Sequence, residues 1–212
     1  LKRHGIEPAP ERKKRTSWKT FLKAHWDVMA ATDFFTVEVW TARGLVTYYG
    51  LFIMHLSTRS VHIAGVTTAP NGAYMKQVAR NLTDVSDGFL LNSRYLIMDR
   101  DTKYTEEFRD YLDREGVKPV RCPVRAPNCN AFAERFVRSI REESLDRMIL
   151  FGEASLRRAL REYVLHFHTE RNHQGVDNQL LTPLATVSST DEPIHCRERL
   201  GGMLNFYYRE AA

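Results

Sequence analysis

The sequence predicts an α/β protein in which a mixed β-sheet is covered by helices. Three runs rich in β-branched and aromatic residues follow one another at 31–40, 45–56 and 59–68, with short polar turns between them, which is typical of hairpin strands. Strand and helix patterns then alternate, so helical crossovers must join the later strands to the same sheet. At 212 residues the chain fits one large domain, or one domain with a small appendage.

The later elements follow from turn signals, caps and hydrophobic periodicity. Thr105 is suited to cap one helix and Gly116 to end it, because glycine accepts the left-handed backbone found after a helix. Pro119 confines the strand around it to a sheet edge, since proline lacks a backbone donor. In chain order we expect a helix over 73–86, a strand over 94–99, a helix over 105–115, a strand over 117–122, and helices over 130–148 and 154–169.

Three acidic residues point to a chemistry. Asp33 lies in the first strand, Asp99 ends a short apolar run, and Glu134 opens a helical pattern, with 34 residues between Asp99 and Glu134. Two carboxylates on strands and one on a helix can converge on a pair of divalent metal ions, which supports phosphoryl transfer on DNA. Hard cations such as Mg²⁺ need oxygen ligands of this kind. No Ser–His or Cys–His pairing in the sequence offers an equally coherent account.

Each of these residues also has a plain structural interpretation. A carboxylate in a strand is costly when buried alone, so Asp33 is either exposed or bound to something. Asp101 competes with Asp99, because the sequence DRD after an apolar run also suits a polar turn. Glu134 alone would be an ordinary surface residue, and Arg138 four residues later offers it an intrahelical ion pair.

Basic residues are placed where they suit a polyanion. Residues 1–23 hold eight Lys or Arg against two Glu, whereas the rest of the chain is close to neutral. Such an arm suits contact with nucleic acid, although a solvated terminus explains the charge equally well. Arg138 and Arg141 follow Glu134 at i+4 and i+7, on the same helix face, and suit DNA phosphates.

Cysteine usage and hydropathy indicate the compartment. Cys122, Cys129 and Cys196 show no C-x-x-C spacing, which indicates reduced thiols in a cytosolic protein. The sequence shows no signal peptide and no long apolar run, so no membrane partner is expected.

Four sequence blocks stand in a familiar order. Asp33 lies in the first strand, MDRDTKYTEEF contains Asp99, and PNCNAFAERFVRSIREE contains Glu134. Together they resemble the catalytic core of retroviral-type integrases and the related bacterial insertion-sequence transposases, the DDE group, over about residues 28–186. The third block resembles P-x-x-N-G-x-x-E, and FHTERNHQGVDNQLLTPLA resembles a downstream Y-N-x-x-R-P-H segment that ends in Thr-Pro; the matching residues are Pro127, Asn130, Arg171, His173, Thr182 and Pro183.

This resemblance implies a ribonuclease H-like fold with a five-stranded mixed sheet flanked by helices. It implies metal-dependent DNA cleavage and strand transfer, with Asp33, Asp99 and Glu134 as catalytic residues and ligands of two Mg²⁺ ions, for which Mn²⁺ substitutes. The expected partners are DNA, as mobile-element ends and target, and further copies of the chain on that DNA. The expected DNA-binding residues are Arg138, Arg141, Asn130 and His173.

The chain departs from the family pattern in two places. Ala131 stands where glycine is common and Asn172 where proline is common, so the loop before Glu134 is expected to differ. The expected organisation is a basic N-terminal linker or arm (1–27), an integrase-like catalytic core (28–186) and a C-terminal tail that packs on the core (187–212). No helix-turn-helix region is visible and the chain starts at Leu1, so we expect an upstream DNA-binding part to be missing. The expected location is the bacterial cytoplasm, at the nucleoid.

Two other functions stay open. A catalytically silent transposase remnant would bind DNA without cutting it in Mg²⁺ or Mn²⁺. A ribonuclease H-type nuclease on the same fold would act on RNA–DNA hybrids. A glycosidase with paired carboxylates ranks behind both, because nothing else in the sequence suggests sugar binding.

Overall fold

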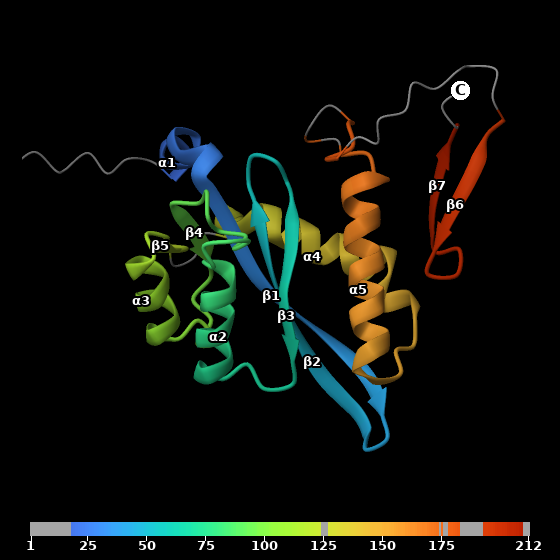
Figure 1. The fold of residues 1–212 in the computed structure, drawn as a ribbon, viewed down its shortest axis with the longest axis horizontal. Helices are drawn as coiled ribbons and strands as arrows, with labels where there is room; N and C mark the ends of the chain where they lie inside the picture. Colours follow the sequence, from blue (N-terminus) through green and yellow to red (C-terminus); the bar gives the residue numbers. More distant parts are fainter. Residues whose placement is uncertain (1–17, 124–126, 174, 176–177, 183–192, 210–212) are drawn as a thin grey trace, which may run out of the picture.

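The computed structural model describes residues 18–123, 127–173, 175, 178–182 and 193–209. Its centre is a five-stranded sheet in the order β3-β2-β1-β4-β5 (Figure 1). The first three strands pair antiparallel, whereas β4 pairs parallel with both β1 and β5, so the predicted mixed sheet is confirmed. The strands are β1 (Met29–Thr41), β2 (Gly44–His55), β3 (Val61–Thr67), β4 (Tyr95–Met98) and β5 (Lys118–Arg121).

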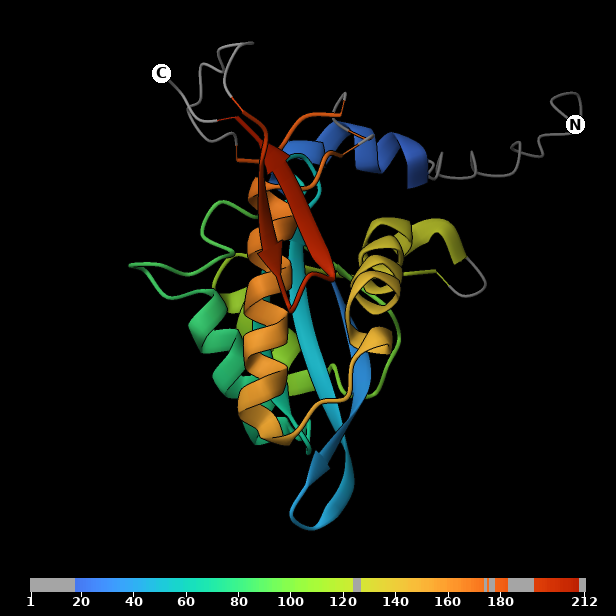
Figure 2. The ribbon, with the colours of Figure 1, turned by 90° about the vertical axis from the view of Figure 1, so that its right-hand side faces the viewer.

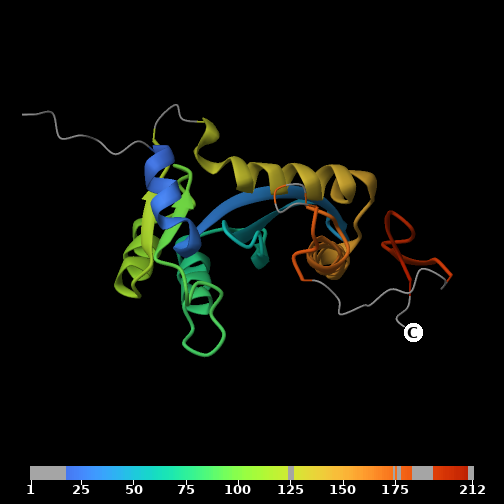
Figure 3. The same ribbon diagram turned by 90° about the horizontal axis from the view of Figure 1, so that it is seen from above.

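Helices cover both faces of this sheet and create two clusters of buried side chains. One cluster contains residues of α2 (Gly72–Leu82) and α3 (Glu106–Arg114); the other contains residues of α4 (Ala131–Glu143) and α5 (Gly152–Thr169). Alternation along β1 places Ala31 and Phe35 in the α4–α5 cluster and Ala30 in the α2–α3 cluster. Figure 3 shows α4 lying lengthwise along the sheet.

The N-terminal part described by the structure is helical. Residues expected in the basic arm form α1 (Trp18–His25) and a 3-10 turn (Trp26–Val28). The ring of Phe21 meets Tyr95 of β4 edge-on at 5.4 Å between centroids, and Trp26 meets Phe132 of α4 at 5.4 Å. These contacts hold the segment against the core through aromatic burial. Residues 1–17, with most of the basic charge, lie outside the described residues.

The C-terminal region forms a β-hairpin beside α5 (Figures 1 and 2), built from β6 (His195–Arg199) and β7 (Leu204–Tyr208). Its anchor is Glu170, whose side chain is fully buried and accepts hydrogen bonds from Arg199 at 2.6 and 2.8 Å and from His166 at 3.0 Å. Burial opposes ionisation, but the hydrogen bonds from Arg199 and His166 outweigh it and lower the pKa of Glu170 to about 2.

Two helices are shorter than the sequence predicts. The helix expected over 73–86 ends at Leu82, because the hydroxyl of Thr83 donates back to Ala79 O at 3.0 Å. The helix expected over 130–148 ends before Ser144, which leaves the helical conformation at φ −143° and ψ −63°. Its buried hydroxyl donates to Ile140 O at 2.8 Å, and its backbone N–H donates to the same carbonyl at 3.2 Å.

The remaining expected elements are found within a few residues of their predicted bounds. Thr105 caps α3 as predicted, since its hydroxyl accepts a hydrogen bond from Phe108 N at 3.3 Å. Gly116 follows that helix with a φ of +85°. Among the described helices, none combines the length and the apolarity needed to cross a bilayer.

Candidate active site

The pairing of two parallel strands brings Asp99 beside Asp33. Ala31 of β1 pairs with Ile97 of β4, and each Asp comes two residues later in its own segment. Because side chains alternate along a strand, both carboxylates fall on the face of Ala31 and Ile97, which α4 covers. β4 ends one residue before Asp99, whose Oδ1 accepts a hydrogen bond from Asp101 N at 2.9 Å.

The surroundings of Asp33 raise its pKa. It is partly buried inside β1, and its Oδ1 accepts a hydrogen bond from Phe34 N at 2.8 Å. Burial raises the pKa of Asp33 to about 6 against this hydrogen bond, and the negative charges of Asp99 and Glu134 add to the rise. The three predicted residues therefore lie close enough to act on one another electrostatically.

Asp101, the alternative to Asp99 as a metal ligand, already forms an ion pair with Lys103. Its Oδ2 lies 2.6 Å from Lys103 Nζ, and its Oδ1 accepts a hydrogen bond from Lys103 N at 2.8 Å. Burial opposes ionisation, but these contacts with Lys103 outweigh it and lower the pKa of Asp101. Asp99 has no cationic side chain as a partner among the described residues, which favours it over Asp101 as a metal ligand.

Glu134 is positioned by the start of α4. It is exposed in the first turn of that helix, where a carboxylate is also favoured by the helix dipole. Just before the helix, Asn130 is 7% exposed, and its Nδ2 donates to Thr32 O at 2.9 Å, next to Asp33. This bond ties the start of α4 to β1. Asn130 Oδ1 is buried and has no hydrogen-bond partner among the described residues.

The oxygen atoms of these side chains are ligands of the kind that a hard cation requires. The set comprises carboxylate oxygens of Asp33, Asp99 and Glu134, together with the unsatisfied amide oxygen of Asn130. A dication among them would remove the repulsion that raises the pKa of Asp33. As they stand, no three His, Cys, Asp or Glu side chains within the described part of the chain are gathered tightly enough to hold an ion. The residues therefore fit a divalent ion in type.

The basic residues of α4 differ in their engagement. Arg138 is exposed, and the described residues include no ion pair between it and Glu134, so the intrahelical alternative is not found. Arg141 instead pairs with Asp146 at 3.2 Å, beyond the end of the helix. Arg138 is therefore the α4 cation on the Glu134 side that is available to a phosphate.

His173, expected at the DNA site, holds the protein backbone. It is 7% exposed, and its Nε2 donates to Phe167 O at 2.6 Å. Burial lowers its pKa. The histidine thus fixes the segment after α5, in which Arg171 binds Glu143 at 2.7 Å. Pro183 of the same motif lies outside the described residues, as do the side chains at 127 and 128.

One neighbour of the carboxylates was not predicted. Cys122 follows β5, and its N–H donates to Met98 O at 2.9 Å, which places it beside Asp99. Burial, Cys129 and the charge of Asp99 raise the pKa of Cys122 to about 12. Its thiol stays protonated and is a weak competitor for a metal ion. The sequence holds no spacing signal for this contact, because only the parallel β4–β5 pairing creates it.

Comparison with protein families gives a match over part of the chain. Residues 115–183 match the family described as integrase core domain. The matched segment contains Glu134, Asn130 and His173, whereas Asp33 and Asp99 precede it. No curated protein sequence matches the chain.

Solved structures with a similar fold include retroviral integrase cores. The HTLV-2 integrase catalytic core domain in complex with magnesium, in its trimeric form, matches with a TM-score of 0.51 and 9% identity over 73% of this chain and 93% of that one. Its dimeric form matches with a TM-score of 0.48 and 12% identity, over 67% and 86%. A simian T-cell lymphotropic virus intasome in complex with PP2A regulatory subunit B56 gamma matches with a TM-score of 0.48 and 12% identity, over 86% of this chain and 67% of that one. The fold is therefore ribonuclease H-like, as predicted, and the resemblance to integrase catalytic cores is confirmed.

Proposed function

We propose that this integrase-like core is a metal-dependent polynucleotidyl transferase that cleaves DNA and transfers the cut strand. The observation that supports this most is the convergence of Asp33, Asp99 and Glu134 from β1, the end of β4 and α4. Asp33 and Asp99 are far apart in sequence, and the parallel pairing of β1 with β4 under α4 brings their segments side by side. A partly buried carboxylate with a purely structural role would be expected to have a cation partner, as Asp101 does.

Asp33, Asp99 and Glu134 would hold two Mg²⁺ ions, or Mn²⁺ in their place. Bound there, the ions would activate the attacking oxygen and stabilise the charge on the phosphoryl and leaving oxygens. Magnesium is bound by the HTLV-2 core of the same fold, and we extend that cofactor to this chain as part of the proposal.

The neighbouring residues would position α4 and the DNA. Asn130 holds the first turn of α4 to β1, so its effect on DNA is exerted through the placement of Glu134. Arg138 would neutralise a phosphate on the exposed side of α4. Arg141 would join it by exchanging Asp146, an exposed and therefore weak partner, for a phosphate. His173 would act through the backbone that it holds.

The proposed partners are DNA ends, target DNA and further copies of this chain. Joining two ends of an element to a target requires two sites acting together, which a single chain does not supply. Dimeric and trimeric forms and an intasome are described for the similar viral proteins, and we extend assembly on DNA to this chain.

The test is nicking of a labelled DNA duplex in Mg²⁺ and Mn²⁺, followed by strand transfer from a pre-cut 3′ end. Asp33→Asn, Asp99→Asn and Glu134→Gln are each expected to lose at least about 100-fold in rate, because each removes a metal ligand. Asp110→Asn, which removes an exposed carboxylate from α3, is the matched control and is expected to keep full activity. Full activity in any of the first three would remove that residue from the site.

The second candidate is a silent DNA-binding remnant. The observation that favours it is the absence of a tight three-ligand cluster among the described residues. It would bind DNA with the affinity of an active core and show no nicking or transfer in either metal, on duplex DNA or on an RNA–DNA hybrid. Cleavage of the hybrid alone would instead point to a ribonuclease H-type nuclease.

A further inference from the structure

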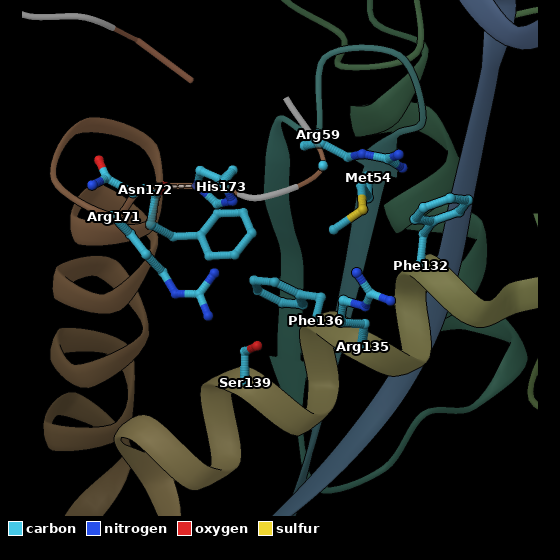
Figure 4. Close-up of a pocket in the computed structure, with 11 residues that line it drawn as sticks. Met54, Arg59, Phe132, Arg135, Phe136, Ser139, Arg171, Asn172 and His173 are labelled. Atoms are coloured by element: carbon cyan, nitrogen blue, oxygen red, sulfur yellow. Dashed lines mark hydrogen bonds between the residues drawn. The ribbon is translucent and has the colours of Figure 1, made fainter. Parts of the chain in front are cut away.

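A second concave site lies on the flank of α4 that faces away from Glu134. It has a volume of about 280 Å³ and is enclosed by α4, the segment after α5 and the turn between β2 and β3 (Figure 4). Phe132, Phe136 and Ser139 line it at i, i+4 and i+7 of α4. Helical periodicity turns Glu134 and Arg138 to the other flank, so this pocket is separate from the carboxylate site.

The pocket is cationic, and the described residues that line it include no acidic side chain. Three arginines reach it, namely Arg59, Arg135 and Arg171. Arg171 is neutralised by Glu143, which binds its Nη2 at 2.7 Å and its Nε at 3.1 Å. Arg59 and Arg135 have no carboxylate partner within the described residues. Two unneutralised guanidinium groups facing one pocket are a site for an anion.

Arg59 is held in place by an unusual local structure. The sequence places it at the start of a strand, but β3 begins at Val61 and Arg59 adopts a φ of +62° in the preceding turn, which is uncommon for a residue other than glycine. Its guanidinium lies over the ring of Phe132 at 3.7 Å and over Trp26 at 5.2 Å. Figure 4 shows Arg59 extending from the turn toward Phe132, with Arg135 projecting from α4.

The guanidinium of Arg59 also has an unmet hydrogen-bonding need. Its Nη1 is buried and finds no acceptor among the described residues. Burial and the charge of Arg135 lower the pKa of Arg59 to about 10, so it still carries its charge at neutral pH and is repelled by its neighbour. An anion between the two arginines would meet both needs, since it accepts hydrogen bonds and offsets the repulsion.

Apolar and aromatic side chains also contribute to the pocket wall, beside the polar Ser139, Asn172 and His173. Met54 and the rings of Phe136 and Phe167 line it together with the arginines. Flat apolar rings beside guanidinium groups suit a ligand that joins a phosphate to a base, because bases stack on aromatic side chains. The volume is near the lower end of small-molecule sites, which start at about 300 Å³.

We propose that this pocket binds a nucleotide, with its phosphate between Arg59 and Arg135 and its base against the aromatic wall. The nucleotide is either free or an unpaired residue of a DNA strand, since both present the same phosphate and base. The site goes beyond the function proposed above, because it uses none of the three carboxylates and needs no metal ion.

The test is binding in EDTA at fixed ionic strength, so that failure of the metal site does not affect it. The probes are dAMP, deoxyadenosine and a fluorescent single-stranded trinucleotide. Arg59→Gly removes one guanidinium and suits the backbone at φ +62°, while Arg135→Gln removes the other from an exposed helix position. Arg158→Gln, on the exposed side of α5, is the matched control for lost charge. A thermal melt of each variant checks that it is folded.

The wild type and Arg158→Gln are expected to bind the phosphate-bearing probes alike. Arg59→Gly and Arg135→Gln are each expected to bind them at least about tenfold more weakly, as loss of a charge-assisted hydrogen bond implies. Deoxyadenosine is expected to bind at least about tenfold more weakly than dAMP for the same reason. Binding of both phosphate-bearing probes identifies a free-nucleotide site, and binding of the trinucleotide alone identifies a DNA contact. The proposal is overturned if neither probe binds, if deoxyadenosine binds as well as dAMP, or if both pocket variants bind like the control.

Discussion

Asp33→Asn is expected to stabilise the metal-free protein while it destroys the proposed activity. The pKa of Asp33 is about 6 in the folded chain and 3.8 in the ordinary unfolded state. At pH 7.5 the carboxylate is ionised in both states, and keeping it ionised in the fold costs up to about 3 kcal/mol, at about 1.4 kcal/mol per pKa unit. Asparagine has almost the same shape, carries no charge and still accepts the hydrogen bond from Phe34 N.

The pH dependence gives this prediction its sign. A carboxyl group whose pKa is raised by folding binds more protons in the folded state, so the free energy of unfolding falls as the pH rises from about 4 to about 6. The free energy of unfolding of Asp33→Asn is therefore expected to exceed that of the wild type by about 3 kcal/mol at pH 7.5 and by about 1 kcal/mol at pH 4.5. Urea unfolding in EDTA at the two pH values measures it.

The control is Asp110→Asn, which removes one exposed carboxylate from α3 and is expected to change stability by less than about 0.5 kcal/mol at either pH. A wild type at least as stable as Asp33→Asn at pH 7.5 would refute the electrostatic strain inferred at this site. An advantage that does not depend on pH would assign the effect to packing instead.

Three further changes test other parts of the structure. Glu170→Gln leaves the two arginines of β6 without their buried partner, so it is expected to cost about 3 kcal/mol and to speed hydrogen exchange in β6–β7. In the wild type, the stability that Glu170 contributes is expected to be full above pH 4.5 and lost as the pH falls toward 2. Hydrogen exchange in β6–β7 that changes neither with the substitution nor with the fall in pH would contradict the role of Glu170 as the anchor of the hairpin. Phe136→Ala empties a buried site between α4 and α5 and is expected to cost about 3–5 kcal/mol in urea unfolding, so a loss under 1 kcal/mol would show that the two helices repack. Arg138→Gln is expected to weaken DNA binding in EDTA for all sequences alike and to reduce the salt slope by about 1, and an unchanged slope would exclude a phosphate contact.

The sheet and its carboxylates are accessible from the sequence because they depend on local patterns. Alternation fixes which side of β1 bears Asp33, and the end of an apolar run locates Asp99 to within one residue. Pro119 indicates an edge strand, and β5 is at the edge of the sheet. Asp101 could not be excluded from the sequence, since its pairing with Lys103 depends on the turn that follows β4.

Other features depend on contacts that no local pattern shows. The hydrophobic pattern of α4 continues past Ser144, but the backbone of that serine leaves the helical conformation. The β6–β7 hairpin is held by Glu170, about 30 residues before its own bonding partner Arg199. The cationic pocket combines the turn at Arg59 with α4 and the segment after α5, so Arg59 and Arg135 become neighbours only in the folded chain.

Whether Asp33, Asp99 and Glu134 form one metal site is tested most directly by calorimetric titration of Mn²⁺ in the presence of a nicked DNA end. The wild type and Asp110→Asn are expected to bind the ion alike, and Asp99→Asn is expected to lose that binding while its melting curve shows a folded protein. Equal Mn²⁺ binding by all three proteins would contradict a metal site at these carboxylates.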